Sequence, residues 1–71
     1  KSLTMTITLN NRQENFSGQE MTIAEIMQAK SFHFRMLVVK LNHQLIKREA
    51  YATTLVKAGD RLDIIHLVSG G

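Results

Sequence analysis

A single stretch of this chain has the pattern of an amphipathic helix, and this limits the folds open to it. Apolar or long side chains recur with helical spacing at Ile23, Ile26, Met27 and Lys30. Thr22 stands three residues before Glu25, which is the spacing of a capping box at the start of a helix. We therefore predict one main helix over residues 22–30, so the rest of the fold has to come from strands.

Segments typical of β-strands lie on both sides of this helix. Residues 5–9 alternate apolar side chains with threonine, as a half-buried strand does. The other predicted strands are residues 14–16, 36–41, 44–46 and 61–68. Asparagine or glycine, which tolerate positive φ, marks turns at residues 10–12, 42–43 and 58–60. Residues 47–57 have no clear period, and we expect a short helical turn there near Ala50.

The predicted order of elements is β-β-α-β-β-β, which indicates an α+β fold. Such a fold is one mixed sheet with the single helix packed on one face. One helix covers only the central strands of a narrow sheet, so we expect the first and last strands to pair there. The period of two in the last strand assigns Leu62 and Ile64 to the core. Met27 and Met36 are expected to fill gaps in the core.

Composition limits the chemistry of the chain. It has 71 residues and no cysteine, so we expect one small domain with no disulfide, no thiolate nucleophile and no cysteine-based zinc site. Its three histidines lack metal-ligand spacing, and no metal site is predicted.

Residues 1–4 are expected to be an N-terminal extension or vector remnant before the domain of residues 5–71. With no membrane-spanning run and no signal peptide, a cytoplasmic protein that is monomeric when free is expected.

The charge pattern argues against nucleic acid as a partner. Nine Lys and Arg residues face six Asp and Glu residues, for a net charge of +3. Acidic residues interrupt the basic ones, and no alternation of basic and aromatic side chains of the kind that tracks a single strand is present. A mild positive field favours an acidic protein partner or a phosphate-bearing ligand, although an ordinary solvated surface would look the same.

The sequence given ends on Gly70-Gly71, directly after the last predicted strand. Because glycine has no Cβ, two glycines form a thin, flexible tether that fits a narrow channel. A carboxylate at its tip suits a group that another protein's enzyme modifies. A frayed terminus of small residues has the same appearance, so the tail alone leaves both interpretations open.

Several features in a fixed order resemble the ThiS family, the sulfur carriers of thiamin biosynthesis. They are Leu-Asn-His-Gln-Leu-Ile-Lys-Arg-Glu at residues 41–49, then Leu55, Gly59-Asp60, Ile64 and Gly70-Gly71. Each is weak alone, but together they extend the resemblance over residues 5–71. It implies a ubiquitin-like β-grasp fold, in agreement with the order of elements predicted above.

The chain departs from the family pattern at three positions. Lys47, Tyr51 and Ser69 stand where proline, tryptophan and a third glycine are usual. None of these departures replaces either glycine of the diglycine. We therefore expect them to alter the partner surface and to leave the chemistry of the tail intact.

The resemblance also implies a chemistry for the tail. A ThiF-like adenylating enzyme would couple the carboxylate of Gly71 to AMP, and a sulfur nucleophile on a donor protein would displace the AMP to leave a thiocarboxylate. A ThiG-like thiazole synthase would receive the sulfur, with Ser69 and Gly70 as the flexible tail. The chain has no phosphate-binding loop motif. We therefore expect the partner to hold ATP and Mg²⁺, and this chain to be a carrier, not an enzyme, with no bound cofactor.

Four residues are candidates for binding the partner. Ile65 and Leu67 lie on the face of the last strand opposite Leu62 and Ile64, where exposed apolar side chains next to the tail would mark a docking site. Val38 on a neighbouring strand is expected to join them. Arg48 matches an arginine of the family and could pair with a carboxylate or phosphate of the partner, or with Glu49 or Asp60 on its own surface.

Three alternative functions remain from the sequence. The molybdopterin-type sulfur carriers are related, but they are longer and often have two prolines before the diglycine, which this chain lacks. A ubiquitin-like protein modifier would use the same terminus to acylate lysines. A small basic RNA-binding β-grasp module would have no terminal chemistry.

Overall fold

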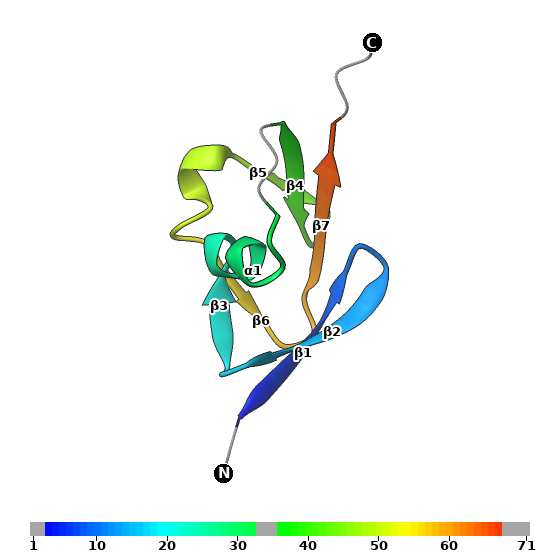
Figure 1. The fold of residues 1–71 in the computed structure, drawn as a ribbon, viewed down its shortest axis with the longest axis vertical. Helices are drawn as coiled ribbons and strands as arrows, with labels where there is room; N and C mark the ends of the chain where they lie inside the picture. The colour runs from blue at the N-terminus through cyan, green and yellow to red at the C-terminus, as the bar shows by residue number, and fades with distance from the viewer. Residues whose placement is uncertain (1–2, 33–35, 68–71) are drawn as a thin grey trace.

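The computed structural model describes residues 3–32 and 36–67. Its elements in chain order are shown in Figure 1. They are β1 (Thr4–Leu9), β2 (Arg12–Ser17), β3 (Glu20–Thr22), α1 (Ile23–Ala29), β4 (Leu37–Leu41), β5 (Gln44–Ile46), the 3₁₀ helix η1 (Arg48–Ala50), β6 (Leu55–Lys57) and β7 (Arg61–His66).

Five of the strands form one mixed sheet in the order β2-β1-β7-β4-β5. β1 and β7 pair in parallel at its centre, with Thr8 opposite Arg61 and Leu9 opposite Leu62. The other neighbouring strands are antiparallel. The helix α1 lies across one face of the sheet (Figure 1). The predicted mixed sheet, its single covering helix and the pairing of its first and last strands are confirmed.

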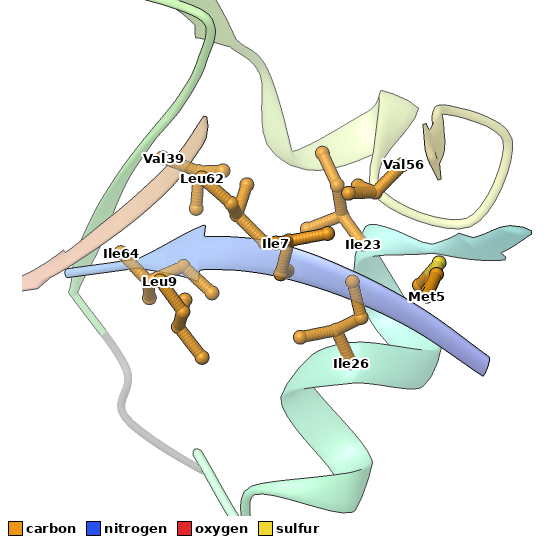
Figure 2. Close-up of a cluster of buried hydrophobic side chains, with 9 residues drawn as sticks. All are labelled: Met5, Ile7, Leu9, Ile23, Ile26, Val39, Val56, Leu62 and Ile64. Atoms are coloured by element: carbon orange, nitrogen blue, oxygen red, sulfur yellow. The ribbon is translucent and has the colours of Figure 1, made fainter. Parts of the chain in front are cut away.

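The core lies between α1 and this face of the sheet (Figure 2). Its buried side chains are Met5, Ile7, Leu9, Ile23, Ile26, Val39, Val56, Leu62 and Ile64. They are all aliphatic or methionine, and no polar or charged residue is buried in the described part of the chain. The core assignment of Leu62 and Ile64 is confirmed, because both are at most 6% exposed.

Two short hairpins hold the sheet in register. Their two-residue turns have positive φ at both positions, at Asn10, Asn11, Asn42 and His43. Positive φ at both turn residues matches the right-handed twist of the flanking strands. Both hairpins are also tied to β7: Asn10 Oδ1 accepts from the Ile64 N–H at 2.8 Å, and Asn42 Oδ1 accepts from the Arg61 N–H at 2.9 Å.

The predicted helix is confirmed at both ends. Thr22 is its N-cap, and both hydrogen bonds of the capping box with Glu25 are present. At the other end the Ser31 N–H donates to the Gln28 carbonyl and the Phe32 N–H to the Met27 carbonyl, at 3.1 and 2.8 Å. This is the Schellman arrangement, in which the residue after the cap takes a left-handed conformation. Here that residue is Ser31, with φ of 60°.

We predict that Ser31→Gly stabilises the protein. A side chain in the left-handed region clashes with the following carbonyl, whereas glycine has no Cβ to clash. The gain should be about 0.5–1 kcal/mol after the extra entropy of glycine in the unfolded chain is subtracted. Urea denaturation measures it, with Ser17→Gly in β2 as the matched control that should lower the unfolding midpoint. A lower midpoint for Ser31→Gly would contradict the assigned cap.

The structure differs from the prediction in two short strands and at the beginning of β1. β3 and β6 form a separate two-stranded antiparallel sheet, with Met21 opposite Val56. Three residues are too few to show an alternating pattern, and their partners are distant in sequence. The helical turn predicted near Ala50 is present as η1. β1 begins at Thr4, inside the segment expected to be an extension, and Thr4 pairs with Ser17 of β2.

Candidate docking surface

The side chains of the central strand β7 alternate between the core and the surface. Leu62 and Ile64 point into the core, whereas Ile65 is 47% exposed and the following Leu67 is 42% exposed. This alternation places Ile65 and Leu67 on the face of the sheet that α1 leaves uncovered. The outward orientation predicted for these two residues is confirmed.

Residues of the neighbouring strands β4 and β5, and Met36 just before β4, extend this surface. Val38 of β4 is directly opposite Ile65, and the Leu67 N–H donates to the Met36 carbonyl at 3.0 Å. Leu45 of β5 is opposite Lys40 of β4, which shares the outer face with Val38 by its period of two. We call Met36, Val38, Leu45, Ile65 and Leu67 the outer patch. All of them except the half-buried Val38 are exposed.

Sequence reasoning missed two members of the outer patch. Met36 was expected to fill the core but is 51% exposed, and Leu45, at 61%, was not assigned to a surface. The signal for Leu45 was present, because a two-residue turn at Asn42-His43 fixes Lys40 opposite Leu45. For Met36 the signal is its even spacing from Val38 along the predicted strand of residues 36–41.

The rest of the uncovered face is polar. β1 contributes Thr6 and Thr8, and β2 contributes their directly opposite partners Asn15 and Gln13. The Thr6 hydroxyl donates to Asn15 Oδ1 at 2.6 Å. On this face, the exposed apolar side chains thus lie on the half of the sheet formed by β7, β4 and β5, whereas the other exposed large apolar residues among those described, Leu3 and Leu55, lie outside these strands. This contrast marks the outer patch as a site for association.

Arg48 lies in η1 and not on the strands β7, β4 and β5. Arg48 begins η1, which connects to the helix side of the molecule through the Ala24 N–H and the Tyr51 carbonyl, 3.0 Å apart. Tyr51 lines a shallow apolar hollow there with Met27 and Phe32. The Tyr51 departure from the family pattern therefore lies on the helix side, and it does not alter the outer patch.

Near the outer patch, the carboxylate of Asp63 forms an ion pair with Arg61 of its own strand and not with Lys40 on the neighbouring strand. Asp63 lies opposite Lys40 on the outer face, but its Oδ2 accepts from Arg61 Nε at 3.1 Å. Arg61 Nη2 also donates to Asn11 Oδ1. Asp60, next to the Gly59 turn with φ of 86°, accepts hydrogen bonds from the Lys57 N–H and from Asn42 Nδ2.

The tail residues Ser69, Gly70 and Gly71 lie outside the described residues, as does Val68. Leu67 is the last residue described, so the outer patch includes the point from which the chain continues to the diglycine.

Within residues 3–32 and 36–67, no group of three His, Asp or Glu side chains is arranged to hold a metal ion. No helix in this part of the chain has the length and hydropathy of a membrane span.

Comparison with known proteins assigns the family. The model of the ThiS family matches residues 6–71, which is nearly the whole chain. The chain belongs to the ThiS family. The predicted resemblance is thereby confirmed.

Solved structures of a relative confirm the ubiquitin-like β-grasp fold. The crystal structure of the thiamine biosynthesis protein ThiS from Geobacter metallireducens has a TM-score of 0.83 and 28% identity, and the match covers 94% of this chain and 100% of that one. The solution structure of a thiamine biosynthesis protein from the same organism has a TM-score of 0.76, also at 28% identity, and the match covers 94% of this chain and 88% of that one.

A curated relative is much longer than this chain. It is the thiazole synthase of Paramagnetospirillum magneticum, which is 28% identical over 67 residues. The match covers 94% of this chain but only 20% of the relative. A segment similar to a ThiS-family chain thus occurs within a protein that is named for thiazole synthesis.

Proposed function

We propose that this protein carries sulfur for the thiazole ring of thiamin, as a thiocarboxylate at Gly71. The observation that carries the proposal is the ThiS-family match over residues 6–71. The likeness to thiamine biosynthesis proteins of Geobacter metallireducens supports a sulfur-carrier role in that pathway. The similarity to a segment of a thiazole synthase supports an enzyme of that kind as the sulfur acceptor.

The proposed reaction begins with activation of the Gly71 carboxylate, because an oxide is a poor leaving group. A partner adenylating enzyme joins the carboxylate to the α-phosphate of ATP, releasing pyrophosphate. A sulfur nucleophile on a donor protein attacks the carbonyl carbon, and AMP departs with the electron pair. When that nucleophile is the terminal sulfur of a persulfide, the product is an acyl disulfide with the donor. A thiol then attacks the donor's sulfur, the S–S bond breaks, and the thiocarboxylate leaves with the electron pair. The covalent intermediate divides one difficult transfer into easier steps.

In this proposal the protein is a co-substrate and not an enzyme. ATP and Mg²⁺ are bound by the adenylating enzyme, and the part supplied by this chain is a docking surface joined to a reactive end. Residues 68–71 follow Leu67, and four extended residues span at most about 14 Å. A partner that binds the outer patch therefore needs its active site within this distance of Leu67.

Intact-mass spectrometry tests the proposal. The protein is incubated with the adenylating enzyme, ATP and the sulfur donor, and its mass should rise by the difference between one sulfur and one oxygen. Fragmentation should place the change on Gly71. Omission of ATP should leave the mass unchanged. A mass that never changes in the complete mixture would contradict the proposal.

Each of the three alternative functions predicts a different experimental result. Isopeptide-linked conjugates with lysines of other proteins would indicate a ubiquitin-like modifier. RNA binding with a steep salt dependence, unchanged when Gly70 and Gly71 are deleted, would indicate an RNA-binding module. Delivery of the sulfur to a molybdopterin precursor and not to thiazole synthase would indicate the related carrier family.

A further inference from the structure

Lys40 is a charged residue of the outer face that lies between Val38 and Leu45 of the outer patch. It is exposed on β4, shares its face with Val38, and has Leu45 opposite on β5. Any partner that covers both Leu45 and Val38 therefore also covers Lys40. Such a partner removes water from the ammonium group as well as from the apolar side chains around it.

In the part of the chain that the structure describes, no carboxylate forms an ion pair with this ammonium group. Asp63 is opposite Lys40, but its carboxylate is engaged by Arg61 Nε at 3.1 Å. Among the described residues, Lys40 takes part in no ion pair or side-chain hydrogen bond. A charge that is buried without a partner is strongly unfavourable, so whatever covers Lys40 has to compensate it.

We infer that the outer patch is built for a protein surface that combines an apolar ridge with a carboxylate set against Lys40. The ridge contacts Met36, Val38, Leu45, Ile65 and Leu67, and the carboxylate forms the ion pair that the protein itself leaves unmade. This inference rests on the proposed function for its choice of partner. Beyond the proposed function, it includes Leu45 of β5 in the docking surface. It also requires a carboxylate on the partner, which the apolar residues alone do not.

A second copy of this chain does not meet the requirement. In a two-fold symmetric dimer the same patch faces itself, so each subunit brings its own Lys40 to the interface. The nearest carboxylate on this face, that of Asp63, is already paired with Arg61. Self-association through the patch would therefore bury uncompensated positive charge, and the inference favours a different, acidic protein.

Isothermal titration calorimetry with purified thiazole synthase tests the inference. Lys40→Glu should raise the Kd by about thirtyfold or more, because it sets two carboxylates against each other. Lys40→Gln, which introduces no repulsion with Asp63, should raise it by about tenfold and make binding less sensitive to salt. Lys57→Glu makes the same charge change on β6, outside the patch, and should change the Kd by about twofold or less.

Three results would overturn the inference without contradicting the proposed function. Kd values for both Lys40 variants within about twofold of the natural protein would overturn it, as would failure of the natural protein to bind thiazole synthase. A stable homodimer in analytical ultracentrifugation that Ile65→Asp disrupts would overturn it too. The conversion of Gly71 to a thiocarboxylate is measured independently, so sulfur loading without an effect of Lys40 would remove the inference and leave the proposed function intact.

Discussion

Deletion of Gly71 is expected to abolish both adenylation and sulfur loading while the domain stays folded. The reaction needs a carboxylate at the end of the diglycine, and a shortened tail presents it one residue short of the partner's catalytic groups. A displacement of about 1 Å is enough to lower a reaction rate about a hundredfold, and one residue is about 3.3 Å long. Pyrophosphate release by the adenylating enzyme and the intact mass of the carrier measure the two steps.

Ser69→Gly is the matched control for this deletion. It changes the tail but keeps its length and its terminal carboxylate, and it restores the third glycine that is usual in the family. Loading should proceed as in the natural protein. If the Gly71 deletion still accepts AMP at a normal rate, the reacting group lies elsewhere and the proposed chemistry is wrong.

Aspartate at two adjacent positions of β7 is expected to have opposite effects. Ile64 is 6% exposed, so Ile64→Asp places a carboxyl group in an aliphatic core at a cost of about 4 kcal/mol or more. A domain of this size has a stability of only about 4–10 kcal/mol, so much of it should unfold. Ile65→Asp acts at the surface and should cost about 1 kcal/mol or less, the range of strand propensity.

Binding reverses the order of these two effects. Ile65→Asp should remain folded and weaken binding to the adenylating enzyme or thiazole synthase by about thirtyfold or more, as loss of an interface hot spot does. Circular dichroism with urea gives the stability, and calorimetry gives the Kd. Unfolding of Ile65→Asp, or full binding by it, would show that the outer patch is assigned to the wrong face or the wrong role.

Local sequence patterns were sufficient for most of the fold. Alternation in Met5–Leu9 and Arg61–His66 identified the two central strands, and the Thr22–Glu25 spacing located the helix start, because these signals depend on neighbouring residues. β3 and β6 could not be predicted, since each owes its existence to a partner far along the chain. Thr4 shows the same limit, because its pairing with Ser17 defines the beginning of β1.

The candidate site was predictable only in part. The period of two correctly placed Ile65 and Leu67 at the surface, and Val38 lies beside them as expected. Arg48 lies in η1 and not on these strands, and a match to a family residue gives no information on which element of the fold it occupies. The lack of an ion pair for Lys40 among the described residues was not foreseeable either, since it depends on the salt bridge between Asp63 and Arg61.

The mass of the mature protein isolated from its own cells tests the central claim most directly. The account predicts a chain that ends at Gly71, of which a fraction has one oxygen replaced by sulfur, and that fraction should disappear when the adenylating enzyme is deleted. A mature chain that continues beyond Gly71 without cleavage, or one that ends there and never contains the added sulfur, would contradict it.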